Sequence, residues 1–174
     1  MPLYKVNKII NLYMIFSENS RVWIYQSDKQ LPDAEVSALQ QQLNSFTTGW
    51  TAHNSQLKAK AEIRYNRFII LIVDENQAGA SGCSIDKSVN YMKQIEQQFG
   101  INLFDRFNLA YRSGNEVVSV PRHTFEELLA NKTINTNTIV FNNLVQNLSE
   151  LKTKWEVPFK DSWHNQLFGS LVPQ

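Results

Sequence analysis

One short stretch of the chain gathers residue types that can act as a nucleophile. It runs from residue 74 to residue 88 and contains the only cysteine of the protein, Cys83. A cysteine near a helix N-terminus has a stabilised thiolate, and a nearby base makes it a better nucleophile. His53 is the histidine that lies closest to it in sequence. Cys83 and His53 are therefore candidate catalytic residues, and the alternative is a buried structural cysteine.

The same stretch can instead bind a small anionic ligand, because glycine-rich turns before a helix present converging backbone N–H groups. The candidate ligand-binding residues are Trp50, Asp74, Glu75, Gly79, Ser81, Gly82, Ser84 and Lys87. Ordinary helix capping, with Ser84 as the N-cap, is the competing explanation for the serines. A nucleotide-hydrolase phosphate loop needs glycine immediately before its lysine, whereas Asp86 precedes Lys87 here. We do not expect nucleotide hydrolysis.

Hydrophobic periodicity predicts the elements that must position these residues. A strand is expected at 21–26, followed by a helix whose apolar stripe runs from Val36 to Trp50. Residues 57–65 alternate between apolar and charged types, which predicts an edge strand with one buried face. Residues 68–73 are apolar throughout, which predicts a central strand covered on both faces.

A second helix, with a stripe from Ile85 to Phe99, and strands at 107–111 and 116–120 complete the first part of the chain. The order predicts an α/β (α+β) fold built on a ferredoxin-like βαββαβ core. In that topology the loop after the first helix and the loop after the third strand leave the same end of the sheet. His53 would then lie near Cys83.

The C-terminal part predicts a helix at 124–131, a strand at 138–141 and a helix at 144–155. We expect this αβα extension to cover the second face of the sheet, because the strand at 68–73 is apolar on both sides. Residues 1–20 are interpreted as an N-terminal extension, and residues 21–174 as one α/β domain.

Composition excludes several classes of function. Seventeen basic and sixteen acidic residues give a formal net charge of +1, which provides no field for nucleic acid or an anionic membrane. A single cysteine forms no internal disulfide and no thiolate zinc cluster, and it favours a reducing compartment. The apolar segment 9–16 is shorter than the roughly 20 residues of a membrane span. We expect a cytoplasmic protein without metal, and the sequence identifies no cofactor.

Six stretches between residues 21 and 165 together resemble a family of small uncharacterised bacterial proteins that often carry the automatic label "ABC transporter ATPase". The stretches are 21–28, 49–54 (GWTAHN), 67–87, 102–106 (NLFDR), 139–143 and 155–164. The resemblance implies no established activity, so no functional residue carries over from it. The chain has neither a phosphate-binding loop of the required spacing nor an LSGGQ-type signature, so the label does not define its function.

The function predicted from the sequence is binding of a small anionic ligand at 74–88. One alternative is a cysteine-dependent enzyme that uses Cys83 and His53. A second alternative is a non-catalytic homo-oligomeric module that dimerises through the strand edge at 57–65 or through the aromatic tail at 155–164.

Overall fold

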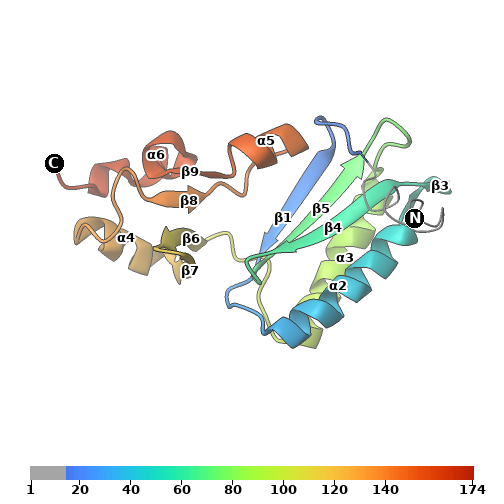
Figure 1. Ribbon diagram of the computed structural model, residues 1–174, viewed down its shortest axis with the longest axis horizontal. Coiled ribbons are helices and arrows are strands. Elements are labelled where there is room, and N and C mark those ends of the chain that lie inside the picture. The colour runs from blue at the N-terminus through green and yellow to red at the C-terminus, as the bar shows by residue number, and fades with distance from the viewer. Residues whose placement is uncertain (1–14) are drawn as a thin grey trace, which may run out of the picture.

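A three-stranded antiparallel sheet forms the centre of the protein (Figure 1). The computed structural model describes residues 15–174, so most of the apolar segment 9–16 lies outside the described residues. The strands β1 (Arg21–Gln26), β4 (Lys58–Arg64) and β5 (Phe68–Asp74) lie in the order β1-β5-β4. Every residue of β5 is buried, whereas β4 is at the edge and mostly half-buried. The predicted central and edge strands are confirmed.

Two helices cover one face of this sheet (Figure 1). They are α2 (Asp33–Thr48) and α3 (Gly82–Phe99), and their buried side chains include Leu39 and Met92. These side chains pack against Ile69, Leu71 and Val73, which point to the helices because alternate residues of a strand share a face. The apolar stripes of the two helices thus build the first core.

The C-terminal part covers the opposite face, as the sequence predicts. Phe68, Ile70 and Ile72 of β5 pack there against Phe141 and Trp155. Phe68 stacks on Phe141 with ring centroids 4.9 Å apart and meets Trp155 edge-on at 5.0 Å. The continuous apolar run of β5 is therefore explained by a core on each side of the sheet.

The expected four-stranded ferredoxin-like sheet is not confirmed. The strands β6 (Asn108–Ser113), β7 (Glu116–Pro121), β8 (Ile139–Phe141) and β9 (Glu156–Pro158) form a second antiparallel sheet, in the order β7-β6-β8-β9. A strand has only two edges, and both edges of β6 are taken, one by β7 along a tight hairpin and the other by β8. No edge of β6 remains to pair with β1.

Short helices complete the C-terminal part: α4 (Arg122–Ala130), α5 (Leu148–Thr153) and α6 (Trp163–Phe168), with 3₁₀ turns at Phe159–Asp161 and Gly169–Leu171. The helix predicted at 144–155 is shorter than expected. It begins only at Leu148, because the Asn147 side chain caps it by accepting from the Glu150 N–H. Within residues 15–174 no helix has the length and apolar character needed to cross a membrane.

A polar cluster joins the two sheets at the turn between β4 and β5. Arg112 donates to the hydroxyl of Tyr65 at 2.6 Å, and this hydroxyl donates to Glu156 at 2.7 Å. Arg112 also donates directly to the same carboxylate, from Nε at 2.8 Å. These contacts hold the turn of the first sheet against β6 and β9.

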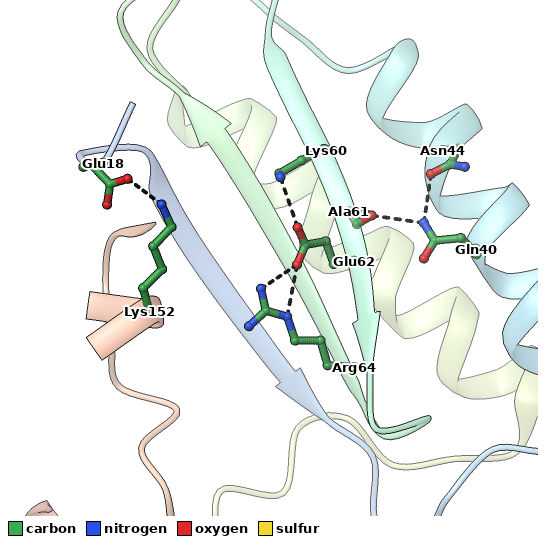
Figure 2. A network of polar contacts seen from close by, with 8 residues as sticks. All are labelled: Glu18, Gln40, Asn44, Lys60, Ala61, Glu62, Arg64 and Lys152. Atoms are coloured by element: carbon green, nitrogen blue, oxygen red, sulfur yellow. Dashed lines mark hydrogen bonds and ion pairs between the residues drawn. The ribbon is translucent and has the colours of Figure 1, made fainter. Parts of the chain in front are cut away.

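Charged side chains lie on the face of β4 that points away from the helices, and Gln40 of α2 meets the outer edge of this strand (Figure 2). Glu62 lies between Lys60 and Arg64 and pairs with both, at 3.0 and 2.8 Å. Although burial acts in the opposite direction, these two cations hold the pKa of Glu62 below its usual range. Gln40 of α2 donates to the carbonyl of Ala61 at 3.0 Å, so one acceptor of β4 is already occupied. Charges and occupied acceptors of this kind limit pairing with another chain.

Candidate functional site

Asp74 is the last residue of β5, and its carboxylate accepts hydrogen bonds from three donors within the protein. Its buried carboxylate accepts from the backbone N–H groups of Ser17 and Asn76, both at 3.1 Å, and from the Lys58 ammonium at 3.2 Å. Burial favours the neutral acid, but the three donors outweigh it and hold the pKa of Asp74 below its usual range. These contacts tie the segment before β1 to the end of β5, and they account for an acid at this position.

In the loop that follows β5, the Glu75 carboxylate accepts a hydrogen bond from the backbone of the same loop. Glu75 accepts from the backbone N–H of Ala80 at 3.2 Å, and it lies 3.8 Å from Arg21. A Cβ atom on Gly79 would lie 3.2 Å from the Glu75 carboxylate, so a side chain at this position would require the Glu75 side chain to shift slightly. The Glu75 carboxylate thus holds an N–H that an external anion would otherwise bind.

The start of α3 is a capping box formed by two serines. Ser81, and not Ser84, is the N-cap: Ser81 accepts from the Ser84 N–H at 3.2 Å, and Ser84 accepts from the Ser81 N–H at 2.7 Å. Trp50 is 2% exposed, and its indole N–H donates to the Ser84 carbonyl at 2.9 Å. Trp50 therefore packs in the first core and joins the end of α2 to the start of α3.

The two candidate catalytic residues lie at the surface. Cys83 is exposed in the first turn of α3, so it is not the buried structural cysteine of the alternative interpretation. His53 occupies the exposed turn between β2 (Thr51–Ala52) and β3 (Ser55–Gln56), where His53 and Asn54 have φ values of 49° and 63°. In the described part of the chain, no hydrogen bond joins Cys83 to His53.

Lys87 and Gly82 are likewise exposed in the first turns of α3, and nothing lies within 4 Å of a Cβ built on Gly82. Residues 15–174 contain no group of three or more His, Cys, Asp or Glu side chains able to hold a metal ion. The 74–88 segment is therefore a capped strand-to-helix turn with an exposed thiol and an exposed lysine.

A groove that the sequence did not indicate lies along the free edge of β1, and residues from both faces of the first sheet line it. We call it the β1-edge groove. Its volume is about 680 Å³, within the usual range for ligand sites. Its walls comprise residues 22–26 of β1, residues 103–110, residues 143–145 with Phe141, Val89 of α3, and residues 163–164. It occupies the place where a ferredoxin-like fold would have its fourth strand.

The backbone N–H and C=O groups of successive β1 residues point alternately toward the two edges of the strand. Ser27 donates its N–H to the Arg67 carbonyl, on the side of β5, at 2.8 Å, whereas Val22 donates to the Gln146 carbonyl, on the other side, at 3.0 Å. Because alternate residues of a strand direct their backbone groups to the same edge, Ile24 and Gln26 share the outward side with Val22. The N–H and C=O of Ile24 form no hydrogen bond with any described residue.

Both ends of the free edge are closed. Gln146 and Asn147 pair with the start of β1, through the Val22 bond and an isolated bridge to Arg21. At the other end the Gln26 side chain donates to the Asn108 carbonyl at 2.7 Å and accepts from the Asn143 amide at 2.8 Å. The open span is thus centred on Ile24.

The rim of the groove is largely apolar, although Asp105 and Arg106 also line the groove. Three of its residues are large hydrophobic side chains exposed to solvent: Phe104 is 39% exposed, Phe107 is 53% exposed and Leu144 is 67% exposed. Scattered exposed hydrophobic residues are normal, but these three surround one groove. An open strand edge with an apolar rim is suited to a second polypeptide segment.

The C-terminal part of the chain contributes Trp163 and His164 to the groove wall. Their rings stack with centroids 3.9 Å apart. His164 is 1% exposed, and burial lowers its pKa to about 4. Its Nδ1 atom lies 2.7 Å from the hydroxyl of Ser162. Around neutral pH this wall is therefore uncharged.

Comparison with protein-family models, with curated proteins and with solved structures finds no match for this chain. The family resemblance of the sequence therefore stays a prediction. The groove itself had no local sequence signal, because it depends on which strand β6 pairs with.

Proposed function

We propose that this protein binds an extended peptide segment of a partner protein by strand addition at the β1-edge groove. The observation that carries the proposal is the unpaired backbone N–H and C=O of Ile24 inside a groove with an apolar rim. An extended segment that pairs with Ile24 would satisfy both groups and add a strand beside β1. Backbone pairing supplies affinity in this mode of recognition, and the side chains around it supply specificity.

The dimensions favour a short segment. Five residues, Val22–Gln26, line the groove, and at about 3.3 Å per residue they span roughly 13 Å. Gln146 closes one end of this span and Asn108 closes the other. We therefore expect four or five ligand residues to contact the groove, with the affinity of a small transient interface.

The test compares two substitutions of one residue. Proline at position 24 removes the outward N–H without removing a ladder hydrogen bond to β5, and proline is tolerated on strand edges for this reason. Ile24→Ala is the matched control, because it shortens the same side chain and keeps the N–H. Wild type, Ile24→Pro and Ile24→Ala are each used to capture clones from a displayed library of random heptapeptides, after urea unfolding has shown that all three fold.

Clones enriched on wild type and Ile24→Ala but lost on Ile24→Pro are the expected result. No enrichment on wild type, or equal capture by Ile24→Pro, would refute strand addition. A dimer in sedimentation velocity that Ile24→Pro abolishes would show instead that a second copy of the chain occupies the edge.

Two other hypotheses concern the 74–88 segment, and both stay proposals. Binding of a small anion at 74–88 is supported by the exposed Lys87 in the first turns of α3, and cysteine-dependent catalysis by the exposure of Cys83. Against the anion stands the Glu75 carboxylate, which holds the Ala80 N–H and would repel a second negative charge. Strand addition is the better supported function because the unpaired groups at β1 have no such internal partner.

A further inference from the structure

His164 uses only one of its two ring nitrogens within the protein. Its Nδ1 atom is 2.7 Å from the Ser162 hydroxyl, and no residue of the described chain forms a hydrogen bond with its Nε2 atom. The side chain is 1% exposed, yet it contributes to the wall of the β1-edge groove. Nε2 is not among the buried side-chain atoms that lack a partner in residues 15–174, so it keeps some contact with solvent and is available to a ligand in the groove that His164 lines.

The contact with Ser162 determines which nitrogen carries the proton. Ser162 is buried, and its hydroxyl has no other partner among residues 15–174. If Nδ1 donated to the hydroxyl oxygen, the hydroxyl hydrogen would have no acceptor. If the hydroxyl donates to Nδ1, both groups are satisfied, and the proton of the neutral ring is on Nε2. The Nε2–H group is then a donor that lacks an acceptor.

The surroundings of this donor are uncharged and aromatic. Phe125 lies with its ring centroid 5.9 Å from that of His164, and the adjacent Trp163 stacks on the other side. The indole N–H of Trp163 is buried without a partner in the described structure. The groove also contains Asp105 and Arg106, but neither forms an ion pair with His164. A carboxylate held at the aromatic wall would lose its hydration, whereas an amide oxygen loses much less.

We propose that the Nε2–H of His164 donates a hydrogen bond to an amide carbonyl oxygen of the segment bound in the groove. This inference rests on the proposed strand addition. The oxygen belongs either to an asparagine or glutamine side chain or to the peptide backbone. His164 is thus a specificity-determining residue, because its Nε2–H favours ligands with an uncharged hydrogen-bond acceptor at this point.

Two substitutions separate the roles of the two nitrogens. His164→Asn places an acceptor near the Nδ1 position, so that Ser162 keeps a partner, but it removes the donor at Nε2. His164→Gln places an N–H group near the Nε2 position. The random heptapeptide library is selected on wild type and on both variants, after each variant has been shown to unfold cooperatively in urea, and the clones selected on wild type are synthesised for titration.

We expect wild-type clones to bind His164→Asn about tenfold more weakly, the usual effect of one hydrogen bond, and to bind His164→Gln within about threefold. A position enriched in asparagine or glutamine on wild type, and enriched in neither on His164→Asn, assigns the oxygen to a side chain. Uniform weakening of all clones assigns it to the backbone.

Equal affinity for wild type and His164→Asn, or enrichment of aspartate or glutamate, would overturn the inference. The absence of any clone that depends on the Ile24 N–H would overturn the proposed function instead. The two failures are therefore distinguishable. If His164→Asn does not fold, weakening by His164→Gln of more than tenfold, with unchanged library preferences, also refutes the assignment.

Discussion

Acidification from pH 7.5 to pH 4.5 is expected to destabilise the protein through the burial of His164. Burial lowers the pKa of this histidine from 6.5 to about 4 in the folded protein. Between these two values the unfolded chain binds a proton and the folded protein does not, so the free energy of unfolding falls as the pH falls. Above pH 6.5 neither state is protonated, and the effect disappears.

The size of the effect follows from the two pKa values. At pH 4.5 the unfolded state is almost fully protonated at this site and the folded state is mostly neutral, which corresponds to a loss of about 2.5 kcal/mol relative to pH 7.5. The side chain is 1% exposed, so screening by solvent does not reduce this figure appreciably. A loss of this size is a large part of the stability of a typical domain.

Urea unfolding at pH 7.5, 6.5, 5.5 and 4.5 measures the effect, with His164→Asn as the matched variant. The variant does not titrate in this range, so its free energy of unfolding should vary by about 2.5 kcal/mol less than that of wild type. Asp74 and Glu62, whose pKa values are lowered, begin to lose their contributions as the pH falls toward 4.5, but wild type and variant share this loss, so it cancels in the difference between them. Parallel pH profiles for wild type and variant would refute the assignment of a neutral buried His164.

Three further predictions concern the 74–88 segment. Asp74→Asn should lower the free energy of unfolding by about 2 kcal/mol at pH 7, because charge-assisted bonds from Lys58 and the backbone are lost, and the difference should begin to shrink only as the pH falls below about 4, as urea unfolding can show. Trp50→Phe should cost about 1–3 kcal/mol, since the Ser84 carbonyl loses its buried donor; an unchanged unfolding midpoint would contradict this. Cys83 should react completely with iodoacetamide in the native protein, with no denaturant present, and a protected thiol in mass spectrometry would contradict its exposure.

Local sequence patterns predicted the elements around the first sheet correctly. The apolar run of β5 and the alternation of β4 each depend on residues within one strand, and the two helix stripes depend on residues within one helix. Gly100, in the left-handed conformation with φ 59°, ends α3 where the sequence places a helix stop. Such signals are readable because the periodicity of side chains follows directly from backbone geometry.

The details of the 74–88 segment depended on contacts that the sequence does not contain. The N-cap is Ser81 and not Ser84: each serine accepts from the backbone N–H of the other, but Ser81 has the extended backbone that precedes the helix, whereas Ser84 lies within the first turn. Trp50 has the residue type of a ligand-binding side chain, yet the meeting of α2 and α3 buries it. Burial is a property of the assembled layers and not of the residue type.

The sequence by itself determined the strands of the first sheet, the two long helices and the presence of a core on each face of β5. Only the tertiary structure decided that β6 pairs with β7 and β8 and leaves β1 with a free edge. The physical reason is that hydrophobic alternation specifies which face of a strand is buried, whereas the partner at its edge is chosen by competition among all available strands. The groove at Ile24 and the place of His164 in its wall are consequences of that choice.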